Sequence, residues 1–154
     1  SINIYKALCA AISLNKGRTV MLSEKGNFPT DLYMMQGISA FSDGQLIATT
    51  EGTPQNIIIW AVNRGGSTLS NQLEGHLLAI NTTSWSPNSQ FLASLGQEDN
   101  LVRVWYVDDG MLIYDLSSEA SVEDIAWFND GTLAVSTSEG LYILDLNLDT
   151  TSNE

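Results

Sequence analysis

The chain has 154 residues, 44% of them hydrophobic, and a mean hydropathy near zero, which fits one soluble globular domain and argues against disorder. No apolar run approaches the roughly 20 residues that cross a bilayer, and the single cysteine, Cys9, excludes an internal disulfide, so we expect an intracellular protein with no membrane contact. Residues 38–154 carry 2 basic and 16 acidic side chains of a chain with net charge −12, which argues against direct nucleic-acid binding.

The first elements in the chain are short and irregular. Residues 9–14 and 20–23 fit two strands joined by a turn at 15–17, and residues 2–8 fit an outer strand. The predicted first strand at Ile12 lies only 29 residues before Phe41, less than the spacing of the later segments. We interpret residues 1–34 as a degenerate copy of the unit that follows.

Three later segments repeat one pattern of an aromatic residue, a turn and two strands. They cover residues 41–60, 85–105 and 127–146, and their leading aromatics Phe41, Trp85 and Trp127 are 44 and 42 residues apart. A period of roughly 40–45 residues made of short strands is typical of β-propeller blades. The repeat therefore predicts an all-β propeller.

The middle segment shows how one blade is built. Its third strand places Val102 and Val104 on one face and Trp105 and Val107 on the other. No stretch of ten residues has helical periodicity, so we expect little helix. Turn residues separate four predicted strands at 79–85, 91–95, 101–107 and 111–116, which form an antiparallel meander.

The same segment resembles the WD40-repeat family. The resemblance is carried by Gly75-His76, by Ser86-Pro87-Asn88, by Leu92-Ala93-Ser94, and by Asp99 six residues before Trp105. The family's final aspartate is Tyr106 here and Ala61 in the preceding repeat, whereas the last repeat keeps Asp145 but has lost the tryptophan. The resemblance covers roughly residues 35–146.

This resemblance implies a propeller with three clear blades and one degenerate N-terminal blade. We place the repeats at 1–34, 35–70, 71–116 and 117–146 of a propeller domain 1–146, followed by a polar tail at 147–154. Most WD40 rings have about seven blades, so we favour part of a larger ring, completed by missing sequence, another copy or another chain. A self-contained four-bladed ring is the alternative.

The resemblance also implies a structural hydrogen-bond network made of His76, Ser94, Asp99 and Trp105. In it the histidine fixes the loop geometry and Asp99 holds the tautomer of the imidazole. Ser94, His76 and Asp99 are also the residue types of a catalytic triad, but nothing suggests an oxyanion hole or an exposed nucleophile. One histidine and one cysteine cannot supply a zinc site, and we expect neither a metal nor a cofactor.

Loops before the first strand and between the second and third strands share one face of a WD40 propeller. We predict a partner-binding rim there that attracts a basic peptide or protein surface. Acidity that serves solubility alone is the plainer alternative. The rim also includes an apolar pair, either half-buried or an exposed anchor. Its predicted residues are Glu51, Glu74, Leu77, Leu78, Glu98, Glu119, Glu123, Asp124 and Glu139.

Repeat and charge together favour a non-enzymatic scaffold for protein–protein interaction. Two alternatives remain open: a self-assembling half-propeller with a structural role, and an enzyme that uses rim carboxylates. The insertion at residues 51–56, together with residues 10–23, gives a weaker resemblance to large WD-repeat proteins of cilia, flagella and microtubules. Cytoplasmic, cytoskeletal or ciliary, and nuclear locations are all compatible with the sequence.

Overall fold

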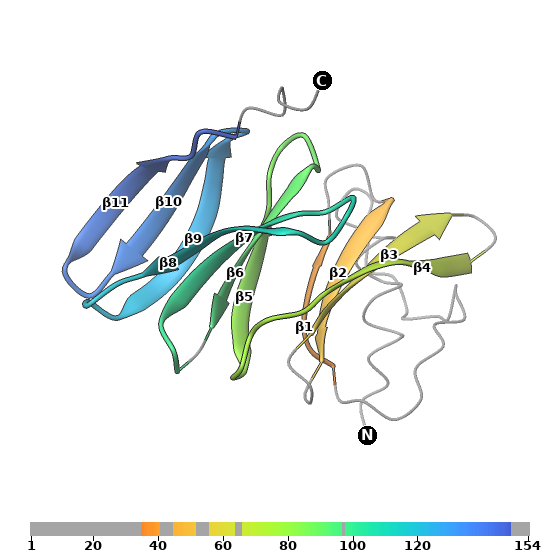
Figure 1. Ribbon diagram of the computed structural model, residues 1–154, viewed down its shortest axis with the longest axis horizontal. Coiled ribbons are helices and arrows are strands. Elements are labelled where there is room, and N and C mark those ends of the chain that lie inside the picture. Colours follow the sequence, from red (N-terminus) through yellow and green to blue (C-terminus); the bar gives the residue numbers. More distant parts are fainter. Residues whose placement is uncertain (1–34, 41–44, 52–55, 64–65, 97, 149–154) are drawn as a thin grey trace, which may run out of the picture.

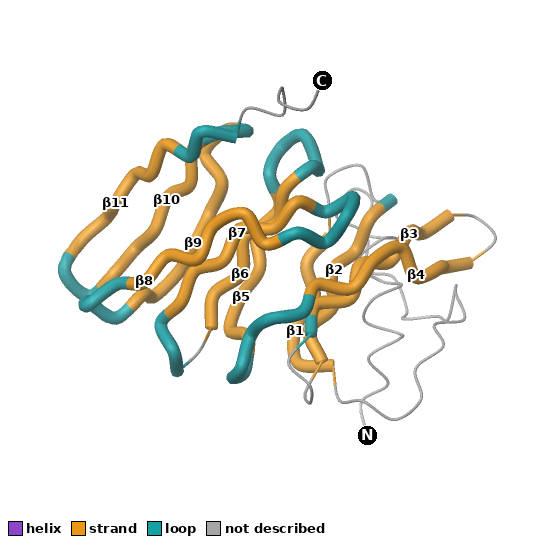
Figure 2. Tube along the Cα trace, viewed as in Figure 1, coloured by secondary structure: helices purple, strands orange, loops and turns teal. Residues whose placement is uncertain are grey.

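The computed structural model describes residues 35–40, 45–51, 56–63, 66–96 and 98–148. These residues form eleven β-strands, and no helix occurs among them, which confirms the all-β prediction (Figures 1 and 2). The predicted degenerate repeat at 1–34 and most of the predicted tail lie outside the described residues.

The strands form three separate antiparallel sheets, each a simple meander in chain order. The first and second sheets have four strands and the third has three. The first sheet contains β1 (Met35–Ala40), β2 (Leu46–Glu51), β3 (Ile57–Asn63) and β4 (Gly66–Leu73). The second contains β5 (Ile80–Trp85), β6 (Phe91–Gly96), β7 (Leu101–Tyr106) and β8 (Leu112–Ser117), and the third β9 (Val122–Asn129), β10 (Thr132–Thr137) and β11 (Gly140–Asp145).

The turns follow from local side-chain chemistry. In the β5–β6 turn, the Ser86 hydroxyl donates to Asn88 Oδ1 at 2.7 Å and accepts the backbone N–H of Phe91 at 3.0 Å. In the β7–β8 turn, Asp109 Oδ1 accepts the backbone N–H of Met111 at 2.8 Å. Short polar side chains that bind their own backbone favour such turns, which is why the sequence located them correctly.

Strands β6 and β7 of the second sheet are buried on both faces between the neighbouring sheets. Leu92, Trp105 and Val107 pack with Ile57 and Ile59 of the first sheet. On the opposite face, a second cluster joins the middle sheet to the third and includes Ala93, Val102, Val104, Val122, Ile125 and Leu133. The alternation predicted for β7 is thus confirmed: one face of the strand packs against the first sheet and the other against the third.

The innermost strands β1, β5 and β9 lie beside one another, and the later strands of each sheet extend away from them (Figure 1). This radial arrangement is that of consecutive propeller blades. The far face of the third sheet is open: Leu141 is 68% exposed and Ile143 is 55% exposed. These two positions correspond to the buried Val102 and Val104 of the second sheet.

Candidate functional site

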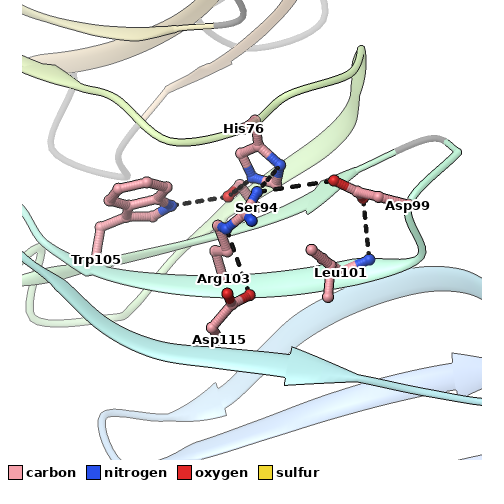
Figure 3. Close-up of polar contacts among 7 residues, drawn as sticks. All are labelled: His76, Ser94, Asp99, Leu101, Arg103, Trp105 and Asp115. Carbon is pink, nitrogen blue, oxygen red and sulfur yellow. Dashed lines mark hydrogen bonds and ion pairs between the residues drawn. The ribbon is translucent and has the colours of Figure 1, made fainter.

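Three elements of the second blade bring the predicted network together (Figure 3). His76 lies in the segment before β5, Ser94 lies on β6, and Trp105 lies on β7. His76 Nε2 is 2.6 Å from Ser94 Oγ, and Trp105 Nε1 donates to the same oxygen at 2.8 Å. All three residues are buried, so these hydrogen bonds link the loop that carries His76 to strands β6 and β7 in the interior of the protein.

Gly75 allows the histidine to reach this position. Its φ of +149° lies in a region that favours glycine, and an added Cβ would be only 3.2 Å from Cη2 of the Trp105 ring. The glycine is therefore needed both for its backbone conformation and for close approach to the indole. This explains why the Gly75-His76 pair stands together in the sequence.

Arg103 is a further member of the network that sequence reasoning did not include. Its guanidinium Nη1 lies 2.8 Å from His76 Nδ1, and its Nε lies 3.4 Å from Asp115 Oδ1 (Figure 3). Only 6% of the residue is exposed. A charged residue between Val102 and Val104 in an otherwise apolar strand was the available signal, because such a residue is rarely buried without partners.

Arg103 determines the tautomer of His76. A guanidinium has donors and no acceptor, so Nδ1 accepts and the proton of the neutral imidazole lies on Nε2, which donates to Ser94. We expected Asp99 to set this tautomer. Asp99 does not do so, because Arg103 occupies the Nδ1 side of the imidazole ring. Asp99 Oδ2 instead lies 3.8 Å from Arg103 Nη1, and Asp99 Oδ1 accepts the backbone N–H of Leu101 at 3.1 Å.

Burial, and to a lesser extent the nearby positive charge of Arg103, lower the pKa of His76 from 6.5 to about 4. Asp99 and Asp115 oppose this shift without cancelling it. The imidazole is therefore neutral at pH 7. A neutral, fully hydrogen-bonded histidine suits a structural role in the loop.

The triad interpretation of Ser94, His76 and Asp99 does not fit this geometry. Ser94 has no exposed surface, and its oxygen already accepts hydrogen bonds from His76 and Trp105. A nucleophile must reach a substrate carbonyl, which a buried strand residue cannot do. This arrangement supports the structural interpretation of the three residues.

The first blade repeats part of the network. Trp60 Nε1 donates to Thr49 Oγ1 at 2.9 Å, at the positions equivalent to Trp105 and Ser94. The third blade has Leu144 and Val135 at these positions and relies on apolar contact instead. In the part of the chain that the structure describes, the polar network is thus most complete in the middle blade.

Four predicted rim glutamates lie in loops at one end of the sheets. Glu74 precedes β5, Glu98 lies between β6 and β7, Glu119 precedes β9, and Glu139 lies between β10 and β11. All four are exposed, and none forms an ion pair with another described residue. Among the described residues, their charges make this end of the three sheets acidic.

The other predicted rim residues are placed differently. Glu123 and Asp124 are exposed but lie on β9 rather than in a loop. Leu77 is 84% exposed and Leu78 is 39% exposed, so this pair fits an exposed anchor better than half-buried packing. Glu51 ends β2, and its side chain lies outside the described part of the structure.

Asn100 joins the rim loops of the second and third blades. Its side-chain amide donates to the carbonyl oxygens of Ser118 and Ala120 at 2.9 and 2.6 Å, and its Oδ1 accepts the backbone N–H of Val122 at 2.6 Å. Its φ of +57° is one that asparagine tolerates better than most residues. One side chain thus holds the whole 118–122 segment in place.

No group of three or more His, Cys, Asp or Glu side chains in the described ranges is arranged to hold a metal ion. Within the same ranges, no helix is long and apolar enough to span a membrane.

Comparison with known proteins agrees with this architecture. Residues 67–106 match the family described as "WD domain, G-beta repeat". The WD repeat-containing protein 26 homolog of Drosophila melanogaster is 34% identical over 115 residues, which are 70% of this chain and 18% of that protein. A kynureninase of Deinococcus radiodurans is 46% identical over 52 residues, 34% of this chain and 12% of that protein.

Among solved structures, the C-terminal WD40 domain of Sif2 superimposes with a TM-score of 0.65 at 19% identity, over 81% of this chain and 35% of that one. At this identity the likeness concerns the fold alone. The chain spans less than a fifth of the length of the two curated relatives above, so their whole-protein activities do not transfer to it.

Proposed function

Because the chain belongs to the WD40-repeat family, whose propellers generally mediate protein–protein interaction and are generally not enzymes, we propose that it is a non-enzymatic interaction module for a basic protein or peptide surface. The observation that carries the proposal is the rim of exposed, unpaired glutamates at one end of the blades. The described polar network around His76 is buried, which supports a role for exposed surface rather than for this network in binding a partner.

Electrostatics supports a basic partner. Glu74, Glu98, Glu119 and Glu139 are exposed in loops that share one end of the sheets, and the chain as a whole carries a net charge of −12. A concentrated field of one sign attracts oppositely charged partners and speeds their encounter. Leu77 and Leu78 add an exposed apolar pair beside these charges, as interaction surfaces commonly have.

A labelled peptide tests this proposal. The probe is a fluorescein-labelled nonapeptide in which glycine alternates with lysine or arginine, and its binding is followed by fluorescence anisotropy at low and at physiological salt. We expect saturable binding that weakens with salt, and about tenfold weaker binding after the four rim glutamates are changed to glutamine. An acidic peptide of the same length is expected not to bind.

A matched variant controls for net charge. Asp108, Asp109, Asp130 and Asp145 lie at the opposite end of the sheets, in or beside the turns that follow first and third strands. Changing these four to asparagine removes the same charge, and we expect less than about a threefold effect on peptide affinity. Equal loss of affinity in the two variants would contradict a specific rim and leave only the general acidity of the protein.

Self-association is a second candidate, favoured by the open face of the third sheet. Phe128, Leu141 and Ile143 are 76%, 68% and 55% exposed, and β11 pairs with no described strand on its outer side. Exposed apolar faces and open strand edges are common sites of assembly. Light scattering would show a dimer or larger species that Ile143→Lys converts to the 16.8 kDa monomer, whereas a monomer at all concentrations would exclude it.

A further inference from the structure

A groove of about 370 Å³ lies between the second and third blades, at the rim end. The end of β8, the start of β9 and the β10–β11 turn meet there, at the lower left of Figure 1. Val102, Leu116, Val122 and Leu144 supply apolar walls. This volume is near the lower end of the roughly 300–1,000 Å³ of ligand pockets, so it suits one or two side chains of a partner.

The mouth of the groove is acidic and aromatic. Glu119 and Glu139 both line it, both are exposed, and neither is paired with a described cation. Tyr142, which is 47% exposed, contributes an aromatic ring to the same lining. The groove therefore combines apolar walls, a ring face and two free carboxylates within one small space.

We propose that this groove receives an arginine side chain of the protein partner, an inference that rests on the proposed binding of a basic surface. The apolar stem of arginine lies along the valine and leucine walls while its charged end stays at the mouth. The planar guanidinium stacks on an aromatic ring and donates in a fork to carboxylates, here Tyr142 and the pair Glu119 and Glu139. Lysine offers a compact charge without the fork or the planar face, so it fits less well.

Hydrogen bonds within the protein constrain the two loops that carry Glu119 and Glu139. The hydrogen bonds of Asn100 to Ser118, Ala120 and Val122 fix the loop that carries Glu119. On the other wall, Thr137 Oγ1 accepts the backbone N–H of Glu139 at 3.2 Å and itself donates to the Gly140 carbonyl at 3.1 Å. Both carboxylates thus stand on constrained backbone, which lowers the entropic cost of binding.

The test compares three labelled peptides of eleven residues, built of glycine and serine with one central arginine, lysine or norleucine. Anisotropy at low salt is expected to show binding of the arginine peptide about tenfold tighter than that of the lysine peptide, and none for norleucine. The double variant Glu119→Gln/Glu139→Gln is expected to weaken the arginine peptide about tenfold, as two exposed charge pairs allow. Tyr142→Leu is expected to remove the preference for arginine over lysine.

The double variant Glu123→Gln/Asp124→Asn is the matched control, because it removes two exposed charges of the adjacent strand β9 that neither line the groove nor belong to the four rim glutamates. We expect less than about a twofold effect on the arginine peptide. Urea unfolding and circular dichroism establish that each variant remains folded.

The outcomes separate the groove from the rim. If the alternating basic nonapeptide binds but the arginine peptide responds equally to both double variants, the rim proposal stands and the groove assignment is overturned. If neither probe binds, both proposals fail. Methyl shift changes in Val102, Val122 and Leu144 on addition of the arginine peptide would support the assignment, and changes confined to other blades would refute it.

Discussion

Nη1 of Arg103 lies 2.8 Å from Nδ1 of His76, and the two side chains come from positions 27 residues apart. His76 is the only histidine in the chain, so this contact determines the protonation of a single observable imidazole. The guanidinium takes the place at Nδ1 where we expected Asp99. The hydrogen bond between His76 and Ser94 consequently runs from the imidazole to the hydroxyl.

Arg103→Met is expected to raise the pKa of His76, because it removes a nearby positive charge while Asp99 and Asp115 remain. Asp115→Asn is expected to lower the same pKa. The titration of one imidazole signal by ¹⁵N-detected NMR measures both, and the nitrogen shifts at pH 7 should show the Nε2–H tautomer. Shifts of the Nδ1–H form would contradict the role given to Arg103.

The free energy of unfolding is expected to fall as the pH is lowered from about 6.5 to 4. The pKa of His76 is 6.5 in the unfolded chain and about 4 in the folded protein. Between these pH values the unfolded chain binds a proton on His76 and the folded protein does not, so protonation favours unfolding. The total loss attributable to this group is about 3 kcal/mol. Urea unfolding at several pH values measures it, and His76→Gln should have a distinctly shallower dependence; equal slopes would refute the assignment.

Ser94→Ala is expected to destabilise the protein by about 2–4 kcal/mol, because it leaves two buried donors, from His76 and Trp105, without an acceptor. Ser136→Ala on the neighbouring blade is the matched control. The Ser136 hydroxyl makes only a 3.4 Å contact to the Asp124 carbonyl, and we expect less than about 0.5 kcal/mol. Chemical denaturation measures the free energy of unfolding of both variants. A similar loss of stability in the two would argue against a stabilising role of the hydrogen bonds to Ser94.

Gly75→Ala is expected to cost more stability than Gly140→Ala. The two glycines have similar φ values, +149° and +154°, but only Gly75 faces a ring, whereas a methyl group at Gly140 meets nothing within 4 Å. Backbone strain of about 1–3 kcal/mol is common to both, and contact with Trp105 adds to it at Gly75 alone. The difference between the urea unfolding midpoints of the two variants measures the effect of the contact between the added methyl group and the Trp105 ring. Equal midpoints would show that the ring moves aside without loss of stability.

Asn100→Asp is expected to destabilise the protein by about 2–4 kcal/mol, although the side chains have the same shape. The change replaces the amide donor that binds the carbonyl oxygens of Ser118 and Ala120 with an acceptor. Asn100→Gly keeps the positive φ and removes the side chain without adding repulsion, so it should cost less than Asn100→Asp. Hydrogen exchange at Val122 should rise in both variants, and an unchanged rate would argue against this link between blades.

Much of the blade architecture was predictable because it rests on local chemistry. Alternation placed Val102 and Val104 on the face opposite Trp105, and the polar turn at Ser86 separated β5 from β6 as expected. The grouping of His76, Ser94 and Trp105 followed from the family resemblance, and the structure brings them together. The position of Glu123 on a strand was not foreseen, because strand ends are the least certain part of a pattern.

What the sequence by itself determined is the repeat: strand, turn and alternation are properties of neighbouring residues and can be read along the chain. What only the tertiary structure decided is which distant side chains meet. Arg103 reached His76 in place of Asp99, and Glu119 and Glu139 came to share one groove, because these outcomes depend on the relative placement of loops and sheets. Hydrogen bonds require positions defined to a few tenths of an ångström, and a one-dimensional pattern does not contain that information.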